Sequence, residues 1–206
     1  MVGSYPVQFD VDFPARPLNR LTTAFRIFVA IPILIVIATL SGETLQANSH
    51  TTTYTLATGG GVLFLPLVLM VVFRQKYPRW WFDWNLNFLK FSNRVSAYLA
   101  LLDDRYPSTD EEQSVHLDFA YPDALQMNRW LPLVKWLLAI PHYIVLFFLW
   151  IAAIVAVIVA WFAILFTGLY PRSLFDFVVG VLRWSNRVNA YAFALVTDQY
   201  PPFSLR

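Results

Sequence analysis

The feature that most constrains this chain is an apolar run over residues 131–166, interrupted only by Lys135 and His142. A helix that crosses a bilayer core about 30 Å thick needs roughly 20 apolar residues. As one helix this run would be about 54 Å long at ~1.5 Å per residue, which exceeds one crossing. We therefore expect the run to turn back on itself near residues 150–153, where Trp150 suits the membrane–water interface.

Two further apolar segments complete the predicted set of membrane spans. One is interrupted only by threonines and Arg26, and the other reaches spanning length only with the uncharged residues that precede it. Charged residues make up 14 % of the chain, whereas a soluble domain usually carries about 25 %. The sequence therefore predicts four spans, at about residues 21–40, 52–73, 131–150 and 152–169.

The distribution of positive charge predicts the orientation of these spans. None of the 15 Lys and Arg residues lies within residues 41–58 or at the expected turn near Trp150. Since positive residues favour the cytoplasmic side, we expect both termini inside the cell. Arg26 and Lys135 sit one or two turns into their spans, so we expect their side chains to extend to the lipid headgroups. The first residues lack the features of a signal peptide, so insertion is expected to use internal spans.

One pattern occurs twice in the sequence and predicts an internal repeat. Residues 91–98 read FSNRVSAY, and residues 184–191 read WSNRVNAY. Each copy then ends in an acidic residue, one further residue and Tyr-Pro, beginning at Asp104 and at Asp198. An even number of spans per copy places a pseudo-two-fold axis along the membrane normal. The predicted domains are residues 1–107 and 108–206.

After each pair of spans comes a segment that is too polar to span a membrane and too apolar to be free in water, at about residues 80–102 and 173–196. Its polar side chains recur every three or four residues, which is typical of a helix in the headgroup plane. We predict that this stripe binds lipid or a partner protein, and the alternative is an ordinary solvated helix face. The stripe comprises Asp83, Lys90 and Arg94 in the first copy, and Asp176, Arg183 and Arg187 in the second.

Two arginines of the stripe, Arg94 and Arg187, share the surrounding Ser-Asn-Arg-Val. A planar guanidinium can bind phosphate or carboxylate bidentately. We therefore expect these arginines to bind either anionic headgroups or the acidic ends of the copies near Asp104 and Asp198.

Two short segments alternate between apolar and polar residues in the manner of strands. These segments, residues 7–13 and 115–121, can pair as a small cytoplasmic sheet. The predicted fold class is an all-α integral membrane protein. It has two tandem repeats, each a transmembrane helical hairpin followed by an amphipathic interfacial helix, with this short β-pair beside them.

The sequence offers little catalytic chemistry. It has no cysteine, which excludes disulfides and thiolate nucleophiles, and its seven glycines form no phosphate-binding loop. The net charge of +2 does not favour nucleic acid as a partner. We expect no enzymatic activity, no cofactor and no metal, with His142 as the one weak metal candidate. His142 could ligate the metal of a haem or chlorin, or its ring could donate to a carbonyl freed by Pro141.

Three motifs of the second copy carry a family resemblance. They are Ala-Ile-Pro-His ending at His142, Phe-Thr-Gly-Leu-Tyr-Pro-Arg ending at Arg172, and Arg-Trp-Ser-Asn-Arg-Val-Asn-Ala-Tyr ending at Tyr191. They resemble a family of bacterial membrane proteins known only as a domain of unknown function. The resemblance covers both copies, although the first copy has Ile33 where the histidine would stand. It implies a bacterial inner-membrane protein and no particular activity.

Three functions are compatible with these observations. The first is a non-catalytic membrane subunit or scaffold, which associates with other membrane subunits or with itself. The second is a lipid-interacting or transport component that uses the basic interfacial helices. The third is a membrane subunit that holds a cofactor through His142.

Overall fold

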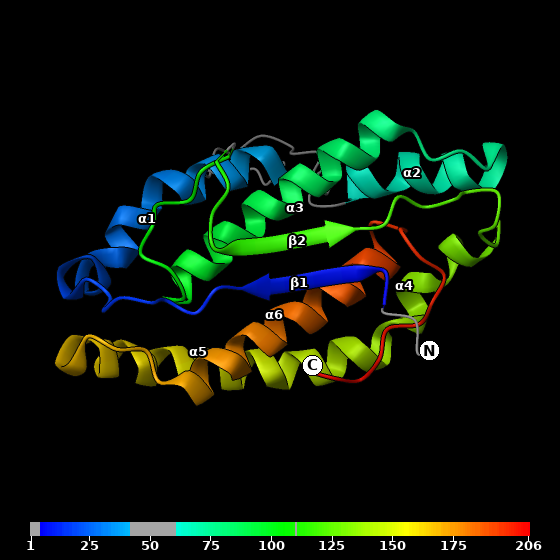
Figure 1. Cartoon of the computed structure of the whole chain (residues 1–206). Helices are drawn as coiled ribbons and strands as arrows, with labels where there is room; N and C mark the ends of the chain where they lie inside the picture. Colours follow the sequence, from blue (N-terminus) through cyan, green and yellow to red (C-terminus); the bar gives the residue numbers. More distant parts are fainter. Residues whose placement is uncertain (1–4, 42–60, 110) are drawn as a thin grey trace, which may run out of the picture.

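The computed structural model describes residues 5–41, 61–109 and 111–206, and within them the chain is mostly helical (Figure 1). Its described elements, in chain order, are β1 (Val7–Val11), α1 (Arg20–Ser41), α2 (Gly61–Arg74), α3 (Arg79–Leu99), β2 (Val115–Phe119), the 3-10 helix η1 (Leu131–Leu133), α4 (Lys135–Leu138), α5 (Ile140–Thr167) and α6 (Arg172–Ala192).

The two strands form an antiparallel pair in which Phe9 lies opposite Leu117 at the centre. Apolar and polar residues alternate along both strands, so one face of the pair is buried and the other is exposed. The predicted pairing of the two alternating segments is confirmed, although each strand ends two residues before the predicted limit.

The elements stack in three layers: the strand pair, then α3 and α6, and then α1 and α5. The strand β1 packs on α6 and β2 packs on α3. Just after β1, the ring of Phe13 lies 4.9 Å from the ring of Phe175 in α6. On its other side α6 packs against α5, and Figure 1 shows α5 running alongside the strands rather than end-on to them. The helices α1 and α5 also meet, since the Trp161 indole N–H donates to the Thr23 carbonyl at 3.1 Å.

The helix α5 is continuous through residues 150–153, so the predicted turn there is wrong. The two predicted spans at 131–150 and 152–169 are instead one helix of 28 residues, about 42 Å long. Pro132 lies in η1 and Pro141 lies in the first turn of α5, where proline is tolerated because its missing N–H would have no helical partner. These prolines shorten the apolar run at its start, and no helix-breaking residue interrupts it later.

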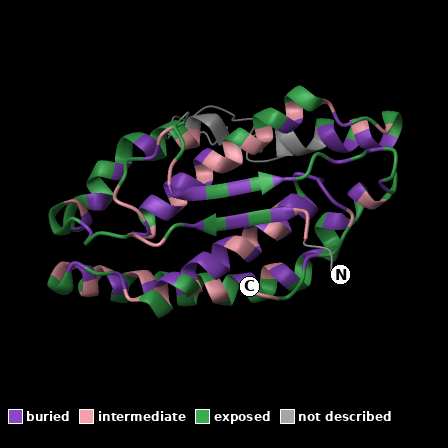
Figure 2. Ribbon diagram, in the orientation of Figure 1, coloured by how far each residue is buried: buried purple, intermediate pink, exposed green. Residues whose placement is uncertain are grey.

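Most of the surface of α5 faces away from the protein. Its buried residues form one narrow stripe, and much of the rest of the helix is exposed (Figure 2). The exposed residues include large apolar side chains such as Phe147, Ile151 and Ile158. The segments Arg20–Ala38 and Ile140–Thr167 are long and apolar enough to cross a membrane, by length and composition, and each is only 22 % buried within the most apolar window.

The two helices predicted from the polar stripe are present. The helices α3 and α6 each have 21 residues and end three or four residues before the predicted limits at 102 and 196. Beyond each helix the chain reverses through a leucine with positive φ, Leu101 at 64° and Leu195 at 52°. Ser41 ends α1, and residues 42–58 of the predicted loop and the first part of the predicted span at 52–73 lie outside the described residues.

Candidate functional site

The side chain of Arg26 is buried inside the protein, at 2 % exposure, and forms an ion pair with Asp104. Its guanidinium also donates to two carbonyls, at 2.9 Å to Tyr98 and 2.6 Å to Asp103. The Tyr98 ring lies 4.4 Å from the guanidinium carbon, close enough for a cation–π contact. The ion pair, the hydrogen bonds and the aromatic ring together offset the free-energy cost of burying the charged guanidinium.

Lys135 has a matching environment in the second half of the chain, and its side chain is 0 % exposed. Its ammonium lies 2.7 Å from a carboxylate oxygen of Asp198, donates to the Thr197 carbonyl at 2.7 Å, and lies 5.2 Å from the Tyr191 ring centre. Burial lowers the pKa of Lys135, and the pairing with Asp198 opposes that shift. An ion pair so placed is costly to break, because either partner alone would be a buried charge.

The same two carboxylates also fix the segments that precede α1 and η1. The backbone N–H of Asn19 donates to Asp104 at 2.7 Å, and the backbone N–H of Asn128 donates to Asp198 at 2.7 Å. Each aspartate therefore joins the end of one helical segment to the start of another.

One prediction about these charges is wrong. Arg26 and Lys135 do not extend to the surface, because Asp104 and Asp198 hold them inside. Arg94 and Arg187 donate to carbonyls shortly after each Tyr-Pro, those of Ser108 and Ser204, and their binding of headgroups or of the acidic ends stays a prediction. The acidic residue before each Tyr-Pro was the available sequence signal, since it accompanies a basic residue at the matching position of each copy.

In α6, the basic residues of the predicted stripe bind other parts of the chain. The guanidinium of Arg183 donates to the Phe9 carbonyl at 2.8 Å, pairs with Asp10 at 2.8 Å, and donates to the Leu205 carbonyl at 3.2 Å. Arg187 donates to the Ser204 carbonyl at 3.3 Å. These two side chains thus hold β1 and the C-terminal residues on α6.

The remaining residues of the stripe are distributed differently. Arg94 is buried and donates to the Ser108 carbonyl at 2.8 Å, whereas Asp83 is exposed. Asp176 is also exposed and pairs with Arg172 one turn earlier on the same helix. The six residues therefore do not form one continuous surface.

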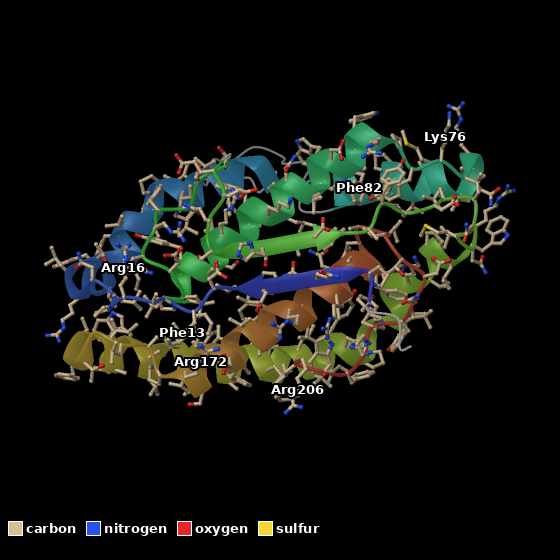
Figure 3. All side chains as sticks on the ribbon, in the orientation of Figure 1. Phe13, Arg16, Lys76, Phe82, Arg172 and Arg206 are labelled. Atoms are coloured by element: carbon tan, nitrogen blue, oxygen red, sulfur yellow. The ribbon has the colours of Figure 1, made fainter. Side chains whose placement is uncertain are left out.

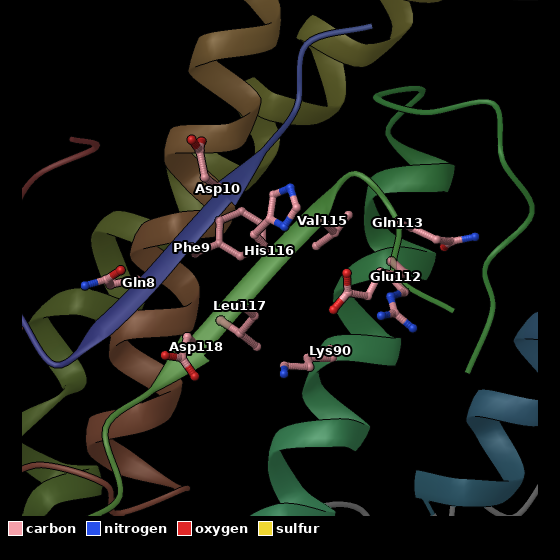
Figure 4. Close-up of a pocket in the computed structure, with 11 residues that line it drawn as sticks. Gln8, Phe9, Asp10, Lys90, Glu112, Gln113, Val115, His116, Leu117 and Asp118 are labelled. Carbon is pink, nitrogen blue, oxygen red and sulfur yellow. The ribbon is translucent and has the colours of Figure 1, made fainter. Parts of the chain in front are cut away.

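Lys90 and Arg94 line a polar pocket between α3 and the strand pair (Figure 4). The pocket has a volume of about 380 Å³, and acidic side chains from three segments share it with these two basic groups. The acidic side chains are Asp10, Glu112 and Asp118. The mixture of charges suits a polar or zwitterionic partner group better than a simple anion.

A pair of buried amides joins α3 to α6. The side chains of Asn93 and Asn186 donate to each other, at 2.8 and 2.7 Å. Each amide N–H₂ also donates to its own helix, to the carbonyls of Leu89 and Leu182. Both asparagines occur in the repeated Ser-Asn-Arg-Val, but the helical pattern alone did not indicate that they meet.

Asn93→Leu is expected to lower the free energy of unfolding by about 1–3 kcal/mol, because the Asn186 amide would stay buried without its partner. Denaturant unfolding in detergent measures the change. The double variant Asn93→Leu/Asn186→Leu is the control. A double variant less stable than the single one would contradict the assignment, because replacing both partners removes the unpaired group.

His142 is buried against aromatic residues at the start of α5. Its Nδ1 accepts a hydrogen bond from the Trp184 indole N–H at 3.0 Å, and its ring stacks on Phe203 with centroids 4.0 Å apart. The expected bond to a carbonyl freed by Pro141 is not formed within the described residues, where Nε2 has no hydrogen-bond partner. Those same residues hold no group of three or more metal-ligating side chains. The cofactor hypothesis remains a prediction.

The fold and these contacts define a mostly helical protein with two helices of membrane-spanning length. Residues 130–204 match a family model described as a domain of unknown function, DUF4389. The matched segment contains the Lys135–Asp198 pair and the His142–Trp184 hydrogen bond, whereas Asn186 binds Asn93 outside it. A search of curated proteins and a search of solved structures gave no match.

Proposed function

We propose that this chain is a non-catalytic membrane protein, a scaffold that associates with other membrane subunits or with itself. The observation that carries the proposal is the exposure of its two longest apolar helices, α1 and α5. A core helix of a soluble protein would be mostly buried, whereas the apolar windows of α1 and α5 are only 22 % buried. Large exposed apolar surfaces mark contact with lipid or with another protein.

Matched contacts support a molecule built from two copies of one unit. The Arg26–Asp104 pair corresponds to Lys135–Asp198 at the repeated positions of the sequence. The bond from Arg94 to a carbonyl after the first Tyr-Pro likewise corresponds to the bond from Arg187 after the second. The positive-charge pattern further supports cytoplasmic termini in a bacterial inner membrane.

The polar contacts also support a structural role. Arg26, Lys135, Arg183 and Arg187 all bind groups of the chain itself. Arg183 fixes β1 on α6, and Arg183 and Arg187 both bind the C-terminal residues. Such contacts make a rigid frame. A partner would then meet the outer face of the strand pair and its pocket, where polar groups of both signs are accessible.

Purification from native membranes with mild detergent tests the proposal. We expect the chain to remain with the membranes after an alkaline wash and to migrate on a native gel at a mass well above its own 23.8 kDa, after correction for detergent. Identification of the proteins at that position distinguishes a larger complex from a homo-oligomer. A monomer without other proteins would contradict the scaffold role.

Lipid binding is the second candidate, because Lys90 and Arg94 line an open pocket whose acidic side chains also suit a zwitterionic headgroup. Zwitterionic lipid that co-purifies with the wild type and is lost in Lys90→Gln would favour this function. Arg172→Gln, which changes an exposed charge away from the pocket, is the matched control. Equal lipid retention by both variants would exclude the pocket as the lipid site.

A further inference from the structure

We infer that α5 lies parallel to the membrane plane, with its exposed apolar side among the acyl chains of one leaflet and the strand pair in water. This inference rests on the membrane location proposed above. It concerns how the protein binds the bilayer, because helices of this length could instead cross it.

The first argument is the polarity of two opposite faces. The strand pair, α6 and α5 are stacked, and the strands run alongside α5 (Figure 1). The outer face of α5 is apolar, and the outer face of the strand pair is polar. The latter consists of Gln8, Asp10, Asp12, His116 and Asp118, which are exposed. We therefore place the boundary between lipid and water parallel to α5, with the apolar face of α5 on the lipid side and the polar face of the strand pair on the water side.

The second argument is the depth that charged groups would have if α5 crossed the membrane. The Trp150 indole N–H donates to the Ser185 hydroxyl at 3.2 Å, two residues along α6 from Arg183. Arg183 and its partner Asp10 are thus level with the inner part of α5, far from both of its ends. The Asp10 side chain is 71 % exposed, so a crossing would place it in hydrocarbon. Ionised groups at that depth are costly unless they are enclosed by protein or water.

The third argument is the position of the basic residues along α5. Arg16 and Lys76 lie toward opposite ends of the molecule, as Figure 3 shows. The Leu18 backbone N–H donates to the Gly168 carbonyl at 2.8 Å, which keeps Arg16 near the end of α5. Arg129 precedes its start and donates to the Gln75 side chain at 2.8 Å, which keeps it near the end of α2. A crossing α5 would divide these residues between the two sides of the membrane. An in-plane α5 places them all on one side, as the positive-inside bias requires.

Aromatic residues fit the same boundary. Trp80, Trp130 and Trp136 are exposed near the shared end of α2, η1 and α4. Tryptophan favours the headgroup region, where its ring is in an apolar environment and its N–H meets polar groups. Helices that lie in the interface are buried about 5–10 Å into the boundary between headgroups and acyl chains.

Depth measurements along α5 test the inference, and the lack of native cysteine allows single-cysteine variants. Ile144→Cys, Ile151→Cys and Ile158→Cys change exposed residues on one side of the helix. Each carries a fluorophore in vesicles containing lipids with quenchers at known depths. We expect equal depths for an in-plane helix. A crossing helix would change depth by about 10 Å per seven residues, and that result would overturn the inference.

Sidedness gives a second, independent readout. Leu125→Cys lies before α5 and Ser173→Cys lies after it, and both positions are exposed. In spheroplasts, which have one membrane orientation, a membrane-impermeant maleimide should label both cysteines or neither of them. Labelling of one position and protection of the other would overturn the in-plane arrangement while leaving the membrane location intact.

A third outcome would separate this inference from the proposed function. Gln8→Cys, on the outer face of β1, is the control that should stay in water. If the α5 probes report neither lipid nor water, and the chain leaves the membrane in an alkaline wash as a dimer, a second copy covers the apolar face. That result would overturn both the membrane location and the inference.

Discussion

Asp104→Asn is expected to lower the free energy of unfolding by about 3–5 kcal/mol, because it leaves the buried Arg26 guanidinium without its counter-charge. The carbonyls of Tyr98 and Asp103 would still accept hydrogen bonds, but they carry no full charge. The backbone N–H of Asn19 would also lose a charged acceptor just before α1. Denaturant or thermal unfolding in detergent measures the loss.

Two controls separate the buried pair from a general effect of charge. Asp83→Asn removes an exposed carboxylate from α3 and should change stability by no more than about 0.5 kcal/mol. Arg26→Met/Asp104→Leu removes both charges and should restore much of the loss, since an apolar pair of similar volume often replaces a buried ion pair. A single variant as stable as the wild type would show that Arg26 is not held by Asp104.

Trp184→Ala is expected to lower the free energy of unfolding by about 3–5 kcal/mol, the usual range for removing a large buried aromatic side chain. The indole contacts the edge of the Phe203 ring and donates to His142, so the change would loosen both the C-terminal residues and the start of α5. Unfolding in detergent and limited proteolysis near the C-terminus are the two measurements. The proteolysis should reveal earlier cleavage after residue 200.

Trp184→Phe distinguishes the ring from its hydrogen bond. It keeps most of the aromatic volume and removes the N–H, so the free energy of unfolding should fall by less than for Trp184→Ala. Some loss should remain, because His142 Nδ1 stays buried without a hydrogen-bond donor. Trp80→Ala, which removes an exposed indole, is the matched control and should have little effect on unfolding in detergent. Equal losses for Trp184→Ala and Trp80→Ala would contradict the core position of Trp184.

Local sequence patterns were sufficient for the elements whose periodicity is unambiguous. Alternation in residues 7–13 and 115–121 predicted two strands, and their pairing is observed. The three-to-four spacing of polar residues predicted α3 and α6 close to their observed limits. In each case one side of the element faces the core and the other side is more polar. Such an element has apolar and polar residues that alternate with the period of its strand or helix.

The course of α5 could not be read from composition in the same way. An apolar run has no polar side, so its periodicity does not distinguish one long helix from two short ones. The predicted turn relied on total length, and it counted the residues before Pro141 that form η1 and α4. Two prolines at the start of the run were the better signal, because they divide it before the long helix begins.

The polar contacts were harder to predict because a helical stripe identifies residues on one side of a helix without identifying what covers them. Arg183 and Arg187 lie one turn apart on α6, but the former binds β1 and the latter binds Ser204. The partners of Arg26 and Lys135 lie 78 and 63 residues away in sequence, well beyond any local pattern. Contacts of that kind depend on the tertiary arrangement.

The reciprocal bond between Asn93 and Asn186 has a consequence for how half of the chain would behave alone. A carboxamide is its own complement, because its N–H₂ donates to the same kind of oxygen that it carries. An antiparallel strand pair is likewise self-complementary, and here Phe9 meets Leu117 at its centre. A half-length chain with one such asparagine and one such strand would present an isologous surface, and we expect it to assemble as a homodimer.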